Sequence, residues 1–286
     1  MAKAEFTGLD PHQKEFVKLI GENARRYRRH EVFRDFCEMA ALSISNTVDR
    51  HQYAAREARY MEIVGRYERA EVERFPRMLA HLVDSLEGGH KDALGQIFMS
   101  MELGDHWKGQ FFTPYELALL MAKITMGDMA AVIEREGFFT LNEPAAGAGC
   151  MVIASAAAML DQGINYQQTM HVTATDIDPT ACHMAYIQFS LLHIPAIVIH
   201  GNALWPEKAW GHWVTPAHVV GLWDARLRRR DREQAAREAL ALAEASTSAK
   251  AAETAPEMPA PAPIERQRAE IVAQRVKASE QLDLFA

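Results

Sequence analysis

The run Asn142-Glu-Pro-Ala-Ala-Gly-Ala-Gly-Cys150 has the residue types and spacing best suited to ligand binding. The preceding residues 138–143 predict a strand, and residues 151–160 after it predict an apolar helix. Two glycines in the turn let the backbone approach a ligand, and the helix start adds unpaired N–H groups and a positive dipole end. A tight strand-to-helix turn without any ligand explains the same glycines, so the motif alone leaves both interpretations open.

Polar residues follow the next two predicted strands. Residues 171–176 predict a second strand ending in Asp176, where a carboxylate can accept both hydroxyl protons of a ribose. Asp178 precedes a proline and fits a helix N-cap, which leaves Asp176 for the ligand. Residues 196–200 predict a third strand. Asn202 follows it, either as a partner of an adenine ring or as a simple turn residue.

The elements that must position these residues alternate between strand and helix across residues 104–224. That alternation predicts an α/β domain with a parallel sheet and right-handed crossovers, in which the carboxyl ends of the strands share one edge. Residues 1–103 are charged and rich in helix formers, and predict a helical domain of three to five helices with a packing role. The helical spacing is clearest in one apolar series: Phe33, Phe36, Ala40 and Ile44.

A second motif, Gly109-Gln-Phe-Phe-Thr-Pro-Tyr115, stands just before a predicted helix. Its aromatics supply an apolar wall, its threonine a hydroxyl and its proline a helix start, although core packing also explains the aromatics. With both motifs, residues 94–223 resemble the class I S-adenosylmethionine-dependent methyltransferases. They resemble more closely the adenine-N6 DNA methyltransferases of the type I modification-subunit kind. The resemblance implies a Rossmann-like sheet, possibly truncated, and S-adenosylmethionine as cofactor.

The resemblance also implies roles for individual residues. In that family the Phe-Thr-Pro segment and the acidic-Pro-x-x-Gly-x-Gly turn surround the methionine part of the cofactor. The acidic residue of the second strand holds the ribose, and a residue after the third strand lies beside the adenine. The implied cofactor-binding residues are Phe112, Thr113, Glu143, Pro144, Ala145, Gly147, Gly149, Asp176 and Asn202.

The family's catalytic loop, Asn/Asp-Pro-Pro-aromatic after the fourth strand, does not occur in this sequence. Its acceptors and its aromatic ring hold the target amino group and stack on the flipped base. Residues 217–220 are the candidate fourth strand, which makes Trp223 and Asp224 weak catalytic candidates for base stacking and hydrogen bonding. The favoured alternative is that Trp223 is a core or interface residue and Asp224 a helix cap.

Two hypotheses about function follow, with a third ranked below them. The first is an adenine-N6 DNA methyltransferase, as in restriction-modification. The second is a catalytically degenerate, cofactor-binding accessory or regulatory protein that works with DNA or a modification complex, where a specificity or catalytic subunit is a partner. The third is methyl transfer to a substrate other than DNA. The intact cofactor motifs favour the first hypothesis, and the missing loop favours the second.

The C-terminal part of the chain has a different composition. Residues 225–245 predict a helix that is basic at its start and then rich in Ala and Glu, and residues 246–286 predict a disordered linker with a terminal motif. The arginines at the helix start are candidates for DNA phosphate contacts, with a solvated helix face as an equal alternative. These arginines are Arg226, Arg228, Arg229 and Arg230.

The last residues, Gln281-Leu-Asp-Leu-Phe285, resemble the bacterial sliding-clamp-binding motif. By this resemblance Leu282, Leu284 and Phe285 fill an apolar cleft, and Gln281 supplies polar anchoring. A short tethered segment of this kind localises the protein attached to it. The alternative is that the segment docks on the protein's own surface.

The composition of the chain argues against several other classes of protein. With 49% hydrophobic and 24% charged residues the chain is globular, and its net charge of −7 argues against a surface coated with nucleic-acid-binding charge. Three scattered cysteines and the spacing of the histidines predict no metal site. No apolar run approaches the ~20 residues of a membrane span, and the start lacks the core of a secretion signal. We therefore expect a cytoplasmic protein without a membrane partner.

Overall fold

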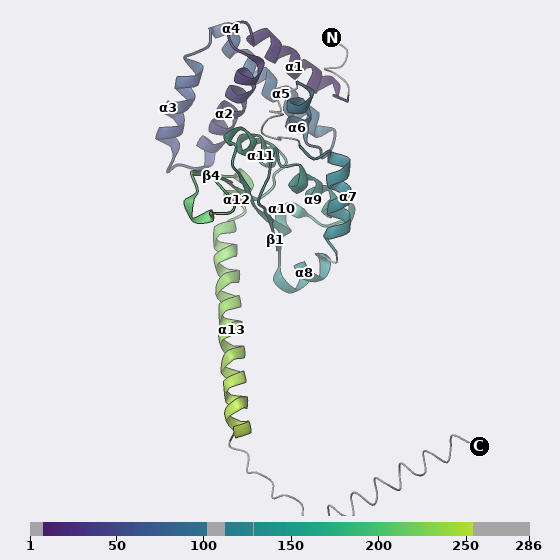
Figure 1. Cartoon of the computed structure of the whole chain (residues 1–286), viewed down its shortest axis with the longest axis vertical. Coiled ribbons are helices and arrows are strands. Elements are labelled where there is room, and N and C mark those ends of the chain that lie inside the picture. Colours follow the sequence, from purple (N-terminus) through teal and green to yellow (C-terminus); the bar gives the residue numbers. More distant parts are fainter. Residues whose placement is uncertain (1–7, 102–111, 128, 254–286) are drawn as a thin grey trace, which may run out of the picture. The chain divides into compact units, whose positions relative to one another are not determined.

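The computed structural model describes residues 8–101, 112–127 and 129–253, with side chains described through residue 245. Figure 1 shows the arrangement of the elements. The chain divides into a unit that ends at Arg230 and a second unit that starts at Asp231. The first unit contains the sheet and almost all of the helices, and it contains the proposed cofactor site and the histidine cluster discussed below.

Six helices precede the segment around the second sequence motif. They are α1 (Pro11–Asn23), α2 (Arg29–Val48), α3 (Tyr53–Val64), α4 (Arg69–Val72), α5 (Arg74–Glu87) and α6 (Ala93–Ser100). The prediction of three to five helices was one too low, because α4 is a separate single turn. The predicted apolar face of α2 is confirmed, since Phe33 and Phe36 are buried in the core.

The α/β part follows as predicted. Helices α7 (Tyr115–Thr125) and α8 (Met129–Glu136) lead into β1 (Phe139–Glu143). Helices α9 (Cys150–Asp161) and α10 (Tyr166–Thr169) connect β1 to β2 (Met170–Asp176), and α11 (Pro179–Leu191) connects β2 to β3 (Ala196–His200). The remaining elements are η1 (Pro206–Lys208), β4 (Gly211–Val214), α12 (Pro216–Val220) and α13 (Trp223–Glu253). The expected fold class, α/β with a preceding helical region, is confirmed.

The sheet has the order β1-β2-β3-β4 among the described residues, with the first three strands parallel and β4 antiparallel to β3. Right-handed crossovers place α9 and α11 on the same face of the sheet. Val172, Ala174 and Val198 point to that face and are fully buried. On the opposite face Thr140 and Asn142 of β1 are exposed, whereas His171 and Thr175 of β2 are buried.

The helical region and the sheet share one core. Helix α2 packs against α11, which itself lies on the sheet (Figure 1). The amide of Gln188 on α11 donates to Asp92, just before α6, and its side-chain oxygen accepts from the backbone N–H of Leu94. The predicted segments 1–103 and 104–224 are therefore continuous in their packing.

The prediction of a fourth strand at residues 217–220 is wrong, because these residues form part of helix α12. The side chain of Thr215 accepts a hydrogen bond from the backbone N–H of His218, and Pro216 occupies the first helical turn. Both features start a helix more strongly than the short apolar run favours a strand. The actual fourth strand, β4, lies beside β3, so β1 is an outer strand of the sheet among the described residues.

Helix α13 also differs from the prediction, since it continues to Glu253 beyond the expected end at residue 245. Residues 254–286, which include the predicted clamp-binding motif, lie outside the described part of the chain. No helix among the described residues combines the length and apolar character needed to cross a membrane.

Candidate cofactor site

The turn between β1 and α9 requires both of its glycines. Gly147 and Gly149 have φ angles of +53° and +95°, in the left-handed region that favours glycine. A Cβ atom at Gly149 would lie 2.4 Å from the ring of Phe189, and one at Gly147 would lie 3.0 Å from the ring of Phe112. The turn therefore packs too closely against these rings to accept a side chain at either position.

Asp176 at the end of β2 holds this turn. Its carboxylate accepts from the backbone N–H of Gly147 at 2.7 Å and from that of Asp178 at 2.9 Å. The expectation that Asp176 is left entirely to a ligand is therefore too simple. A carboxylate offers about four acceptor positions, so two amides leave capacity for ribose hydroxyls. The predicted N-cap is confirmed, since Asp178 accepts from the backbone N–H of Thr180.

The three parallel strand ends are tied together at one edge. The backbone N–H of Ala146 donates to the carbonyl of Thr175 at 2.9 Å, and that of Gly201 donates to the carbonyl of Asp176 at 2.9 Å. These bonds fix the turn after β1 and the loop after β3 against the end of β2. The predicted gathering of these motifs at the carboxyl edge is confirmed.

Glu143 places a second carboxyl group beside the turn. Its side chain is half-buried and accepts from the backbone N–H of Ala145 at 3.2 Å. Burial raises the pKa of Glu143 above its ordinary value, and the charge of Asp176 raises it further. A positively charged ligand group at this edge would stabilise the ionised form of both carboxyl groups.

The second sequence motif lies beside the same turn as far as it is described. The ring of Phe112 contacts Gly147 and packs against Phe98 with a centroid distance of 5.1 Å. The thiol of Cys150 at the start of α9 donates to the carbonyl of Thr113 at 3.3 Å. The structure thus brings Phe112 and Thr113 to the glycine turn, while residues 109–111 lie outside the described part.

A hollow of about 230 Å³ opens on the exposed face of the sheet at the same edge. Asn202 lines it, but its side-chain oxygen accepts from the backbone N–H of Leu204 at 2.9 Å, as in the turn-residue alternative. Complete small-molecule sites usually have volumes of roughly 300–1,000 Å³, so this hollow suits one ring system rather than a whole cofactor. Trp205, 57% exposed, forms part of its wall.

Several residues of this hollow were missed from the sequence. Thr173 and Thr175 lie two positions apart on β2 and so point to the same face of the sheet as the hollow. Trp205 follows Asn202 by three positions, and its place in the loop after the third predicted strand was the signal for it. Pro144 lines the hollow as well, and so connects the hollow to the glycine turn.

Trp223 lies at the other end of the sheet. It is fully buried, with ring centroids 5.1 Å from Phe138 and 5.3 Å from His171. His171 precedes Asp176 by five positions along β2, a separation of about 16 Å in a strand. The catalytic interpretation of Trp223 is wrong, and the core alternative is confirmed. Asp224 lies beside it and pairs with His218 at 3.2 Å, also remote from the glycine turn.

Two of the four predicted DNA-contacting arginines also pack at that end. The guanidinium of Arg226 lies 3.6 Å from the ring centroid of Trp223, and that of Arg230 lies 4.7 Å from the ring centroid of Phe138. Burial lowers the pKa of Arg226. Arg228 and Arg229 are exposed on α13. Phosphate contact by these residues stays a prediction.

A parallel α/β sheet with a left-handed glycine turn after its first strand and an acidic end to its second strand defines a Rossmann-like nucleotide-cofactor-binding protein. Comparison with known protein families gives a more specific assignment within this class. Residues 100–222 match the family model of the N-6 DNA methylases. The resemblance expected from the sequence is confirmed over this segment, and with it S-adenosylmethionine as the cofactor that sequence and family indicate.

Comparison with individual proteins gives less information about the chain than the family match. No curated protein matches the chain. Among solved structures, a protein from Listeria monocytogenes assigned as a class I S-adenosylmethionine-dependent methyltransferase is similar, at 14% identity and a TM-score of 0.38. The alignment covers 68% of this chain and 55% of that one. This chain therefore spans just over half of that relative.

Proposed function

We propose that this chain binds S-adenosylmethionine at the carboxyl edge of its sheet and takes part in methylation of adenine N6 in DNA. The observation that carries the proposal is the left-handed turn at Gly147 and Gly149, fixed by the carboxylate of Asp176, inside the segment that matches the N-6 DNA methylases. Both positions require glycine, because a Cβ atom at either one would press against an aromatic ring of the protein.

The charges at this edge suit the proposed cofactor. S-adenosylmethionine carries a positive sulfonium and an ammonium group, and Glu143 and Asp176 place two carboxyl groups next to the turn. The remaining acceptor positions of Asp176 suit the ribose hydroxyls. The hollow beside Asn202 and Trp205 suits the adenine ring, which would stack on the indole.

The chemistry of transfer needs groups that the described residues do not place at this edge. The methyl group moves from sulfur to the adenine nitrogen, which loses one proton, and the amine needs an acceptor to become a better nucleophile. The sequence has no Asn/Asp-Pro-Pro-aromatic loop, and Trp223 lies at the opposite end of the sheet. The sheet also lacks, among the described residues, a strand on the outer side of β1.

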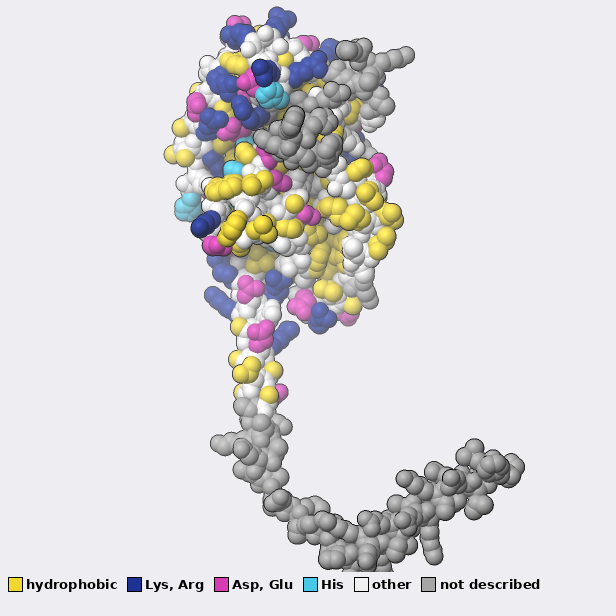
Figure 2. Space-filling model, viewed as in Figure 1, with side chains coloured by type: hydrophobic (Ala, Val, Ile, Leu, Met, Phe, Trp, Pro, Cys, Tyr) yellow, Lys and Arg dark blue, Asp and Glu magenta, His cyan; other side chains and the backbone are white. Residues whose placement is uncertain are grey.

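These observations favour a second candidate function, a cofactor-binding subunit completed by a partner that supplies the acceptor groups. Helix α7 packs on α9 through Ala118 and Ala122 and leaves a large apolar stripe exposed, and Figure 2 shows apolar side chains gathered over this part of the molecule. The stripe consists of Leu117, Leu120, Met121 and Ile124. Contiguous exposed apolar surface of this kind marks interaction sites. A parallel strand added to β1 would end beside the glycine turn.

DNA, a specificity or catalytic subunit and the bacterial sliding clamp are the partners we propose. The exposed Arg228 and Arg229 supply candidate phosphate contacts, and Gln281, Leu282, Leu284 and Phe285 supply the proposed clamp-binding segment. The clamp would deliver the chain to newly replicated DNA, whose new strand lacks methylation. The alternative that the chain acts without catalysis, as an accessory to a modification complex, uses the same cofactor site.

One experiment separates these functions. We would measure binding of S-adenosylmethionine by calorimetry and transfer of its labelled methyl group to unmethylated bacterial DNA, for the native chain, Asp176→Ala and Asp178→Ala. Binding that is lost in Asp176→Ala and kept in Asp178→Ala supports the cofactor site. Transfer by the chain alone then identifies an enzyme, and binding without transfer identifies a subunit that needs a partner. Undiminished binding by Asp176→Ala contradicts the proposal.

A further inference from the structure

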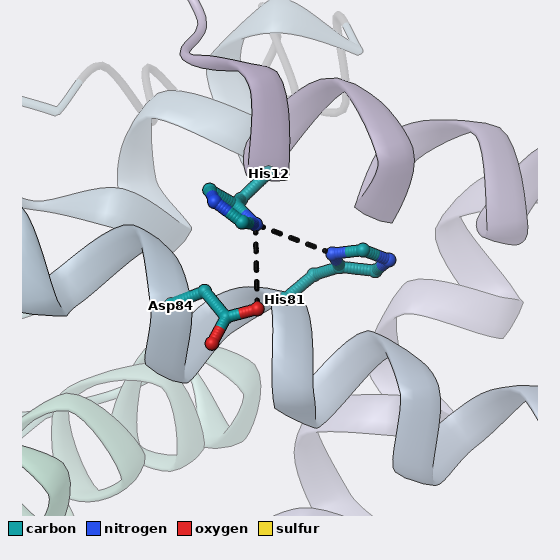
Figure 3. Close-up of side chains that lie close together, drawn as sticks. All are labelled: His12, His81 and Asp84. Atoms are coloured by element: carbon teal, nitrogen blue, oxygen red, sulfur yellow. Dashed lines mark hydrogen bonds and ion pairs between the residues drawn. The ribbon is translucent and has the colours of Figure 1, made fainter.

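Three side chains with metal-binding atoms converge between α1 and α5, in the helical region (Figure 3). His12 comes from α1, and His81 and Asp84 come from α5. The Nδ1 atom of His12 lies 3.4 Å from Oδ2 of Asp84 and 3.5 Å from Nδ1 of His81. All three ligand atoms lie within 4.8 Å of one another.

These separations fit a small tetrahedral metal centre. With metal–ligand bonds of about 2.0–2.1 Å, tetrahedral geometry places neighbouring ligand atoms about 3.3–3.5 Å apart. Two of the three separations have this value, and the third is at most 4.8 Å. Two imidazoles and one carboxylate are a donor set typical of zinc. We propose that His12, His81 and Asp84 bind one zinc ion.

Hydrogen bonding alone explains the arrangement less well. The two Nδ1 atoms face each other at 3.5 Å, which is beyond the usual 2.7–3.2 Å range of a hydrogen bond donated by N–H. One proton between them would satisfy a single contact and leave the approach of Asp84 to the same nitrogen of His12 unexplained. A cation at the centre satisfies all three atoms at once.

The backbone holds the three ligands in place. His81 and Asp84 are separated by three positions on α5, so they lie on the same side of that helix. Leu82 is buried in the core and anchors this turn of α5. On α1, the carboxylate of Asp10 caps the helix start next to His12, and Asp10 also binds Lys91 at 2.6 Å. That lysine is thereby engaged beside the site without pairing with Asp84.

The site is accessible from solvent. The side chains of His12 and Asp84 are 45% and 48% exposed. Three protein ligands leave a fourth position for water, as in open zinc sites. A bound ion would link α1 to α5 and would therefore stabilise the folded helical region by mass action. Residue spacing along the chain does not indicate this site, because His12 and His81 are distant in the sequence and meet only through helix packing.

The test uses the full chain without a histidine tag, freed of metal by a chelator. Zinc is titrated by calorimetry into the native chain, His12→Gln, Asp84→Asn and the control His51→Gln, which changes an exposed histidine between α2 and α3. We expect one zinc per chain, binding at least about 10-fold weaker in His12→Gln and Asp84→Asn, and unchanged binding in His51→Gln. Zinc should also raise the melting temperature of the native chain and of His51→Gln only.

Two results would overturn the proposal. One is the absence of saturable binding by the native chain at micromolar zinc. The other is equal affinity in the native chain and in a double variant, His12→Gln with His81→Gln. Circular dichroism of each variant verifies its folding, and because the substituted side chains are partly exposed, we expect all of them to fold. Cobalt provides a second readout, since a tetrahedral site gives it visible absorption that the double variant should lack.

Discussion

The backbone N–H of Gly147 donates to the carboxylate of Asp176 at 2.7 Å, which joins the turn after β1 to the end of β2. Because the second oxygen of Asp176 accepts from Asp178, one side chain organises two adjacent loops. The acidic residue therefore shapes the proposed cofactor site before any ligand binds. This double role predicts that changes at Asp176 affect stability as well as binding.

Asp176→Asn should destabilise the protein and weaken cofactor binding. The amide keeps one acceptor oxygen but presents N–H groups to the other backbone donor, so one hydrogen bond is lost. We expect a loss of about 1–3 kcal/mol in the free energy of unfolding, measured by urea denaturation. Asp161→Asn is the matched control, because its exposed pair with Lys123 contributes at most about 1 kcal/mol. Equal stability of the two variants would contradict the structural role.

Gly149→Ala and Gly163→Ala separate backbone strain from steric exclusion. Both glycines have positive φ angles, +95° and +73°, but a Cβ atom at Gly163 meets no atom within 4 Å. We expect Gly163→Ala to cost about 1–2 kcal/mol from strain alone. Gly149→Ala should cost clearly more, since its Cβ atom lies 2.4 Å from the Phe189 ring. Denaturation curves of the two variants measure the difference, and similar costs would argue against a crowded turn.

Two tryptophans should behave in opposite ways. Trp223 is fully buried, so Trp223→Ala should lower the free energy of unfolding by about 3–5 kcal/mol. Trp205→Ala removes an exposed ring, and its stability should change by less than about 0.5 kcal/mol while S-adenosylmethionine binds more weakly. Urea denaturation and calorimetry provide the two measurements. A stable Trp223→Ala that binds cofactor normally would refute its place in the core.

The buried histidine pair predicts loss of stability in acid. Burial, together with the neighbouring His218 2.8 Å away, lowers the pKa of His171 from 6.5 to about 4. The unfolded chain takes up this proton first, so stability is full above pH 6.5 and falls as the pH decreases toward 4. The shift corresponds to about 3 kcal/mol.

The measurement is the free energy of unfolding between pH 7 and 4 for the native chain and His171→Gln. The stability of the variant should decline less steeply with falling pH. Part of the decline should remain, because burial also lowers the pKa of His183 to about 4. The exposed His51→Gln serves as control and should keep the native slope. An unchanged slope in His171→Gln would exclude this histidine as a source of acid sensitivity.

The proposed clamp-binding tail is tested by pull-down with a bacterial sliding clamp. Removal of residues 281–286 should abolish binding, and Phe285→Ala should reduce it strongly because the aromatic ring fills the apolar cleft. Ala286→Gly, just outside the motif, is the matched control and should bind normally. Clamp binding by the truncated chain would exclude this segment as the contact.

The local elements of the cofactor site could be predicted from the order of the amino acids. Glycines at 147 and 149 fix a left-handed turn, Asp178 before Pro179 fixes a helix start, and the runs 171–176 and 196–200 form strands. These features depend on residues close together in the chain, through backbone sterics and capping bonds, and so they appear as sequence patterns. The position of Phe112 beside the turn was likewise implied by the motif that it belongs to.

Features that depend on packing between distant segments could not be predicted and appear first in the folded chain. Residues 217–220 are apolar enough for a strand, but Thr215 and Pro216 start a helix there, and β4 pairs with β3 instead. Trp223 suited a stacking role by type alone, yet burial places it against His171 at the amino end of the sheet. The approach of His12 to His81 also depends on packing between distant segments, because the spacing of residues along the chain does not indicate which helices pack together.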